Sequence, residues 1–194
     1  MTTSLSLPAT RPGVLVDRLP GAALRDVLLV LGGATVTGLS AQFAFVTPLS
    51  PVPFTLQTLA VLLTSTALGA ARGAAAMVVY LVAGAAGVPW FAGHSHGVGA
   101  PTFGYVVGFV LAAALVGRLA ERGTDRRWGS TLAVMVAGNA VIHTVGATWL
   151  ALATGLDVQQ AFGLGVAPFL LTDALKIAFT VGALPLAWRL VHRD

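Results

Sequence analysis

The chain has 194 residues, of which 56% are hydrophobic and only 9% are charged, whereas a soluble domain carries about 25% charged residues. This composition excludes a water-soluble globule, because too few polar side chains are present to cover its surface. The formal net charge is +4, but the basic residues stand singly or flank apolar runs, which argues against nucleic acid as a partner. The sequence contains no cysteine, so disulfides and thiolate metal sites are excluded. We therefore expect an integral membrane protein.

Residues 1–23 form a polar N-terminal segment that contains Pro8, Arg11, Pro12 and Arg18. This segment lacks the short apolar core and the small-residue cleavage site of a signal peptide. We expect it to be a cytoplasmic tail that leads into one membrane domain over residues 24–194.

Six apolar segments follow the tail, at approximately residues 24–46, 55–68, 73–88, 102–119, 130–153 and 166–190. A bilayer core about 30 Å thick requires roughly 20 residues of helix, and the second and third segments are shorter than that. The pattern predicts an all-α membrane protein with six transmembrane helices in a single bundle.

The basic residues predict the orientation of this bundle. Ten of the 11 lie in the N-terminal tail or at the start of the first segment, between the second and third segments, at the end of the fourth segment or between it and the fifth, or at the C-terminal end of the chain. Since cytoplasmic loops collect Lys and Arg, both termini are predicted to be cytoplasmic. The glycine-rich loop at residues 89–101 then faces the outside.

The eleventh basic residue, Lys176, lies inside the last apolar segment together with Asp173. The two residues are three apart, so they share one helix face, and Lys176 is roughly 15 Å into its span. Charged side chains at this depth are costly and usually face the bundle interior, where they serve a ligand, an ion or a proton. The alternative is a structural ion pair, but an unused pair would keep its desolvation cost. We interpret the pair as a polar ligand clamp.

Three other polar side chains are candidates for the same site. Asn139 and His143 are four apart on the fifth segment, and Asn139 lies at a depth similar to that of Lys176, so Asn139 is the preferred second member. His143 is either a hydrogen-bonded packing residue or a ligand contact. Gln57, at the outer end of the second segment, either bonds another helix or lines the mouth of a pocket.

The outer loop and the start of the fourth segment supply aromatic candidates. Trp90, Phe91 and Tyr105 are either interfacial aromatics or a lid over an apolar ligand ring. Ser95, His96 and the loop's backbone N–H groups are suited to an anion. His94 and His96 do not predict a metal site, because the loop contributes neither cysteine nor an acidic residue.

Other classes of function have little support in the sequence. It lacks the G-x-x-x-x-G-K-[ST] phosphate loop, and no nucleophile and base occur at a meaningful spacing, so an enzyme is not expected. The Asp-Lys pair of the last segment has no counterpart in the third segment, which weakens an inverted-repeat secondary transporter.

Several motifs, taken in order, resemble the BioY family, the biotin-binding S components of energy-coupling factor (ECF) transporters. They are PVPFTLQTLAVLL, GVPWFAG with the glycine-rich loop leading to APTFGYVVGF, GNAVIH, and D-A-L-K in the last segment. The resemblance covers residues 24–190. The chain departs from it in PTFGY, where PTGGY is expected most often, and in an outer loop without a basic residue.

The resemblance implies an ECF S-component-like bundle in a prokaryotic plasma membrane that captures biotin from outside, with no cofactor. A transmembrane coupling protein and two ABC-type ATPases would supply the energy. In that family the first helix docks through small residues, so Ala34 and Gly38 would contact the coupling protein, while internal packing is the alternative for them.

Charge balance suggests how biotin would lie. Asp173 would accept from a ureido N–H and Lys176 would donate to the ureido C=O, because a second carboxylate near this pair would leave a net buried negative charge. The carboxylate would then meet Ser95, His96 and backbone N–H groups of the outer loop. Three other functions stay open: an S component for another vitamin, an ion-coupled secondary transporter that uses Asp173, and a structural subunit without a ligand.

Overall fold

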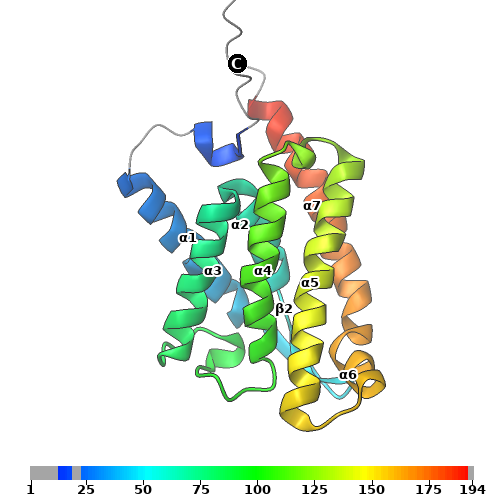
Figure 1. Cartoon of the computed structure of the whole chain (residues 1–194). Helices are drawn as coiled ribbons and strands as arrows, with labels where there is room; N and C mark the ends of the chain where they lie inside the picture. Colours follow the sequence, from blue (N-terminus) through cyan, green and yellow to red (C-terminus); the bar gives the residue numbers. More distant parts are fainter. Residues whose placement is uncertain (1–12, 19–22, 192–194) are drawn as a thin grey trace, which may run out of the picture.

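The computed structural model describes residues 13–18 and 23–191, and it is predominantly helical (Figure 1). The α-helices and strands, in chain order, are α1 (Ala23–Gln42), β1 (Ala44–Thr47), β2 (Ser50–Thr55), α2 (Gln57–Leu68), α3 (Ala70–Ala85), α4 (Phe103–Ala120), α5 (Trp128–Thr154), α6 (Val158–Gly165) and α7 (Leu170–Val191). Short 3-10 turns are η1 (Leu15–Arg18), η2 (Ala92–His94), η3 (Thr124–Arg126) and η4 (Ala167–Phe169). Most of the expected tail, residues 1–12 and 19–22, lies outside the described residues.

Four stretches of the described chain are long and apolar enough to cross a membrane: Ala23–Gln42, Phe103–Ala120, Trp128–Thr154 and Val158–Leu190. The helices α2 and α3 are shorter, with 12 and 16 residues. All six predicted apolar segments are therefore largely helical, and four of them reach the length of a span.

The sequence did not predict two elements at the end of the molecule opposite the termini. The first expected helix extends to residue 46, but α1 ends at Gln42 and a β-hairpin follows. Its strands pair Ala44 with Thr55 and Phe45 with Phe54. Prolines at 48, 51 and 53 supply no backbone N–H and cannot continue a helix, but they are tolerated at the edge of a two-stranded ribbon.

The second unexpected element is α6, within residues predicted to be a loop. Asp157 caps it, because its side chain accepts from the Gln160 N–H while the Gln160 side chain reaches back to the Asp157 N–H. Such a capping box satisfies two of the free donors at a helix N-terminus. The hairpin is held to α6 by Ser50, whose hydroxyl donates to the Leu164 carbonyl at 2.6 Å.

The helix α4 forms the centre of the molecule and packs against α2, α3 and α5, while α5 also packs against α7 (Figure 1). The close approach of α4 to the α2–α3 corner depends on Gly117. A Cβ at that position would lie only 2.5 Å from the backbone nitrogen of Ala70. This packing leaves one end of α2, α4 and α7 free to surround a cavity.

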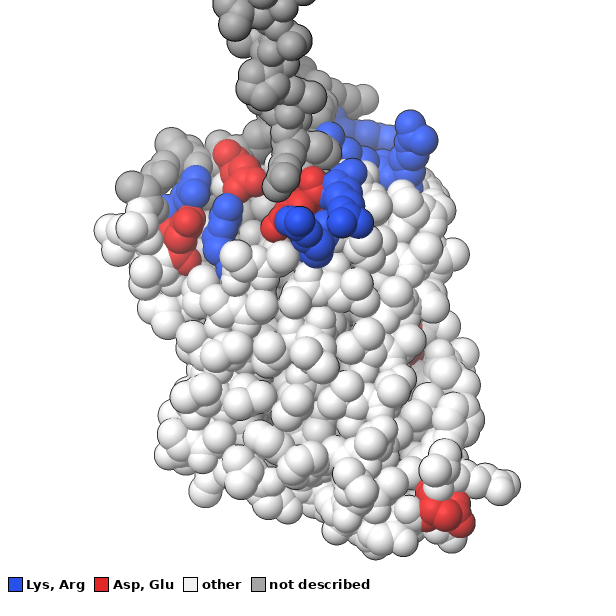
Figure 2. All heavy atoms as spheres, in the orientation of Figure 1, with Lys and Arg blue, Asp and Glu red and all other residues white. Residues whose placement is uncertain are grey.

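Charged residues are distributed unevenly along the molecule. Figure 2 shows Lys and Arg gathered at the end where η1 and the last turn of α7 lie, with a broad uncharged belt below them. At this end Arg72 pairs with Asp17 at 2.6 Å, and Arg126 donates to the Gly13 carbonyl at 3.1 Å. The belt is the surface that suits lipid tails.

Candidate functional site

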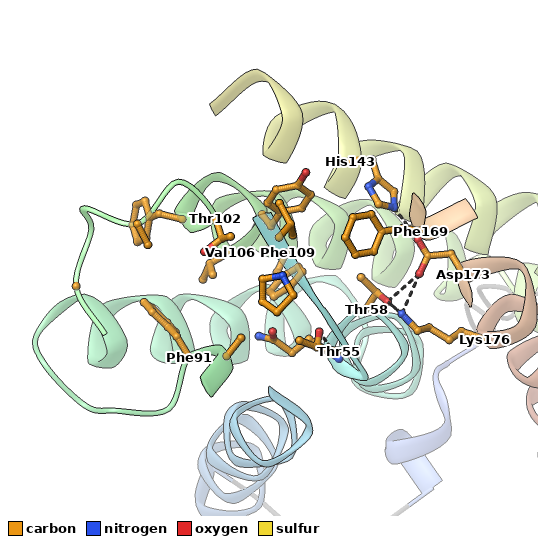
Figure 3. A pocket seen from close by; sticks show the side chains of 18 residues that line it. Thr55, Thr58, Phe91, Thr102, Val106, Phe109, His143, Phe169, Asp173 and Lys176 are labelled. Atoms are coloured by element: carbon orange, nitrogen blue, oxygen red, sulfur yellow. Dashed lines mark hydrogen bonds and ion pairs between the residues drawn. The ribbon is translucent and has the colours of Figure 1, made fainter. Parts of the chain in front are cut away.

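A cavity of about 60 Å³ lies where β2 and the α3–α4 loop meet the helix bundle (Figure 3). It is enclosed by β2, the loop between α3 and α4, and parts of α2, α4, α5, η4 and α7. Its lining residues are Val52, Pro53, Thr55, Gln57, Thr58, Phe91, Ala92, Gly97, Ala100, Thr102, Phe103, Tyr105, Val106, Phe109, His143, Phe169, Asp173 and Lys176. We call it the central cavity.

One side of the central cavity carries a hydrogen-bonded group of four side chains, Thr58, His143, Asp173 and Lys176, which we call the polar cluster (Figure 3). Asp173 is only 3% exposed. Its Oδ2 lies 2.6 Å from His143 Nε2, and its Oδ1 lies 2.9 Å from Lys176 Nζ. Lys176 Nζ also donates to Thr58 Oγ1 at 2.9 Å, and Thr58 Oγ1 lies 3.4 Å from Asp173 Oδ1. The cluster thus ties α2, α5 and α7 together.

The polar cluster keeps unused hydrogen-bonding capacity. An ammonium group has three donors, and Lys176 uses two of them, on Thr58 and Asp173. Within the described part of the chain, one N–H of Lys176 therefore remains for another group at the cavity. The cluster carries no net charge when His143 is neutral, so it suits a polar, uncharged group of a ligand better than an anion.

Aromatic rings form much of the remaining wall. Phe91, Phe103, Phe109 and Phe169 line the cavity, and the Phe169 ring lies 5.9 Å from the ring of His143. The hairpin supports this wall, since Phe54 packs on Phe169 with ring centroids 4.4 Å apart. Such a wall suits an apolar ring system.

Tyr105 connects three elements at the cavity. It lies on α4, its hydroxyl donates to the Gly165 carbonyl at the end of α6 at 2.7 Å, and its ring packs edge-on against His143 of α5. The absence of a side chain at Gly146 makes room for this ring, because a Cβ there would overlap it. The hydroxyl is therefore engaged within the protein, and the ring borders the cavity.

The Gln57 side chain is also held in place by hydrogen bonds on the side away from the cavity. Its Nε2 donates to the Tyr80 hydroxyl at 2.8 Å, and that hydroxyl donates to the Trp90 carbonyl at 3.1 Å. Trp90 Nε1 in turn donates to the Tyr80 carbonyl at 2.9 Å. Trp90 thus fastens the outer loop to α3, while its neighbour Phe91 lines the cavity.

The structure brings together five of the residues expected at the site: Asp173, Lys176, Gln57, Phe91 and Tyr105. Four others do not line the central cavity. Trp90 packs behind it, Asn139 lines a separate groove on α5, and Ser95 and His96 are exposed on the loop, where the Ser95 hydroxyl donates to the Ala92 carbonyl at 2.9 Å.

Sequence reasoning missed Thr58, Thr102 and Phe169. Thr58 directly follows Gln57 in the PVPFTLQT motif, and this position in the motif is what could have indicated it as a site residue. Phe169 lies within the apolar segment that holds Asp173, four residues before it, and nothing in the sequence distinguishes it from the other phenylalanines of the chain.

Ala34 and Gly38 lie on the buried face of α1. Ala34 is 1% exposed, and a Cβ at Gly38 would touch the Trp90 ring at 3.2 Å. Both positions therefore pack inside the molecule, which is the alternative that the sequence left open beside partner docking.

The BioY family model matches residues 9–193. The biotin transporter BioY of Thermotoga maritima is 40% identical over 134 residues, which cover 67% of this chain and 77% of that protein. A probable biotin transporter BioY of Pyrococcus horikoshii is 35% identical over 160 residues, covering 81% of this chain and 92% of that protein.

The fold has a match among solved structures. The crystal structure of an S-component for biotin from an ECF-type ABC transporter superposes with a TM-score of 0.74 at 20% identity, covering 90% of this chain and 96% of that one. The fold is therefore that of an ECF S component. From the family match and the similarity to its relatives, this chain belongs to the BioY family.

Proposed function

We propose that this protein is the membrane-embedded subunit that captures biotin for uptake, energised by a partner ECF module with a coupling protein and two ATPases. The central cavity supports this most directly, because a neutral polar cluster faces an aromatic wall inside a member of the BioY family. Biotin combines the two matching parts, a polar ureido group and an apolar bicycle.

In the proposed pose the ureido group meets the polar cluster. The free N–H of Lys176 donates to the ureido C=O, and a lone pair of Asp173 accepts from a ureido N–H. Asp173 and Lys176 already balance each other's charge, so a ligand carboxylate placed beside them would leave a net buried negative charge, at a cost of several kcal/mol.

The biotin carboxylate is assigned to the outer side of the cavity. Ser95 and His96 were expected to meet it, but they lie off the cavity, whereas Thr102 lines it at the N-cap of α4. The Thr102 hydroxyl and the positive end of the α4 dipole are suited to a carboxylate. This outer contact needs no basic residue, which the loop lacks.

The size of the cavity implies that its wall moves when biotin binds. About 60 Å³ is well below the roughly 150 Å³ of an engineered cavity that holds benzene, and a bicycle with a valeryl chain is larger than benzene. The hairpin and the α3–α4 loop are the parts of the wall outside the helices. We assign the opening of the cavity to the hairpin and the α3–α4 loop. In the proposed orientation six helices cross the membrane, both termini are cytoplasmic, and these two segments lie on the outer side.

The test is to purify the protein in detergent and identify any retained small molecule by mass spectrometry, followed by thermal unfolding with a panel of vitamins. We expect biotin to be retained and to raise the melting temperature more than any other vitamin. Stabilisation by a different vitamin would overturn the substrate. Uptake driven by an ion gradient without an ATPase partner would overturn the ECF assignment.

A further inference from the structure

Charge is confined to one side of the central cavity. Among the described residues that line it, Asp173 and Lys176 are the only Asp, Glu, Lys or Arg residues, and they pair with each other at 2.9 Å. The hairpin and the α3–α4 loop, at residues 44–55 and 86–102, contain no Asp, Glu, Lys or Arg. The part of the cavity that these two segments enclose therefore offers a ligand no ionic partner.

The α3–α4 loop leaves this part of the cavity accessible to solvent. Several of the loop residues that line the cavity have small side chains and are half-buried, namely Ala92, Gly97, Ala100 and Thr102. A Cβ added at Gly97 or at Gly99 would meet nothing within 4 Å apart from its chain neighbours. A ligand tail that reaches the loop therefore has room to continue past it into water.

The interactions open to a carboxylate at the loop are weak ones. The Thr102 side chain makes no capping bond to α4, so its hydroxyl is able to donate to a ligand oxygen, and an amide oxygen accepts such a bond as a carboxylate oxygen does. A carboxylate strengthens that bond and interacts with the α4 dipole, but it also gives up more hydration than an amide. The net preference for the charged tail should therefore stay within about fivefold, or 1 kcal/mol.

On the basis of the proposed function, on which this inference depends, we propose that the protein also captures neutral amides of biotin. These include amides that join the biotin carboxyl group to the side-chain amine of lysine. The ureido group of such a ligand meets the polar cluster as that of biotin does, and only the tail at the α3–α4 loop differs. The class of ligand is therefore set by the ureido bicycle and not by the charge of the tail.

Isothermal titration of the purified chain, freed of any retained ligand, tests the proposal with three compounds: biotin, its carboxamide, and the amide of biotin with the lysine side chain. We expect the Kd of each amide to lie within about fivefold of that of biotin. If biotin binds and either amide shows a larger loss, the corresponding part of this inference is overturned while the proposed function stands. If biotin itself does not bind, the proposed function is overturned, and this inference with it.

A cation introduced at the loop should supply the discrimination that the parent chain lacks. Gly99 stands between the lining residues Gly97 and Ala100, and nothing lies within 4 Å of a Cβ added there. Gly99→Lys should raise the preference for biotin over its carboxamide by about two- to fivefold relative to the parent chain, as for a partly exposed charge pair. The matched variant Gly99→Gln should leave the preference unchanged. No change in Gly99→Lys, or the same change in both variants, would overturn the placement of the tail at the loop, on which the proposal depends.

Discussion

Within the polar cluster, Asp173 and Lys176 differ in how much of their bonding capacity is already used. The Asp173 carboxylate meets four neighbours, His143, Lys176, Thr58 and Asn139. Lys176 uses two of its three donors, so the cation keeps a larger share of its hydrogen bonds for a ligand. We therefore expect Lys176 to contribute more directly to ligand affinity, and Asp173 to contribute mainly by holding Lys176 in place.

Replacing Lys176 by alanine should weaken biotin binding at least about tenfold, or 1.4 kcal/mol, because the ureido oxygen loses its donor. Isothermal titration of the purified protein measures this change. Leu175→Ala is a matched control, since Leu175 is the adjacent residue of α7 but is 66% exposed on the opposite side. Equal affinities for the parent chain and Lys176→Ala would contradict the assigned site.

The sequence predicted part of this cluster for a clear physical reason. Asp173 and Lys176 stand out because charge is rare in an apolar helix, and that rarity carries information about function. Thr58 does not stand out, because a hydroxyl residue is common in membrane helices and most of them bond their own backbone, as Thr64 does with the Ala60 carbonyl. Which threonine meets Lys176 depends on how α2 faces α7, and the sequence alone does not specify this.

Among the elements, the helices were more predictable than the segments that close the cavity. Long apolar runs predicted α4, α5 and α7 to within a few residues. The hairpin was missed because Ala44, Phe45 and Val46 continue the apolar run of α1. The helix α6 was missed because it has only eight residues. Both elements depend on contacts with each other, such as the Ser50 bond to Leu164.

The contact between Gly84 of α3 and Phe91 of the outer loop gives a prediction for these elements. A Cβ at Gly84 would overlap the Phe91 ring, so Gly84→Ala should push Phe91 away from the cavity. We expect a loss of about 1–3 kcal/mol in stability, as for other overpacked sites, together with weaker biotin binding. Thermal unfolding and titration measure the two effects.

A suitable control is Gly182→Ala in α7, where nothing lies within 4 Å of the added Cβ. Alanine favours a helix over glycine, so this variant should be at least as stable as the parent chain. If Gly84→Ala behaved like Gly182→Ala, Phe91 would not be held in place by α3.

At the scale of the whole molecule, the buried side chain of Asp125 links η3 to α7 at the end where η1 lies (Figure 1). Asp125 lies in η3, is fully buried, and accepts from Trp188 Nε1 near the end of α7 at 2.5 Å. The neighbouring Arg126 lies 4.3 Å from the centre of the Trp188 ring and also bonds Gly13. Three distant parts of the chain therefore meet at η3.

Burial raises the pKa of Asp125 above its usual value, although the bond from Trp188 and the charge of Arg126 oppose that change. A carboxyl whose pKa is higher in the folded state binds its proton more tightly there than in the unfolded chain. Stability should therefore fall as the pH rises from the usual pKa through the raised one. Asp125→Asn keeps an acceptor for Trp188 and should remove this decline, as measured by melting temperature across a pH series. A decline of equal size in both proteins would contradict the assignment to Asp125.

His143 and Asp173 border both the central cavity and the groove between α5 and α7, so a single pair of hydrogen-bonded side chains separates the two compartments. A change in what fills either compartment alters the surroundings of the same two side chains. Any free energy that couples the two compartments must be reciprocal: the factor by which an occupant of the groove changes the affinity for a ligand in the central cavity equals the factor by which that ligand changes the affinity for the occupant. The surroundings of the bundle therefore take part in setting how tightly the protein holds its ligand.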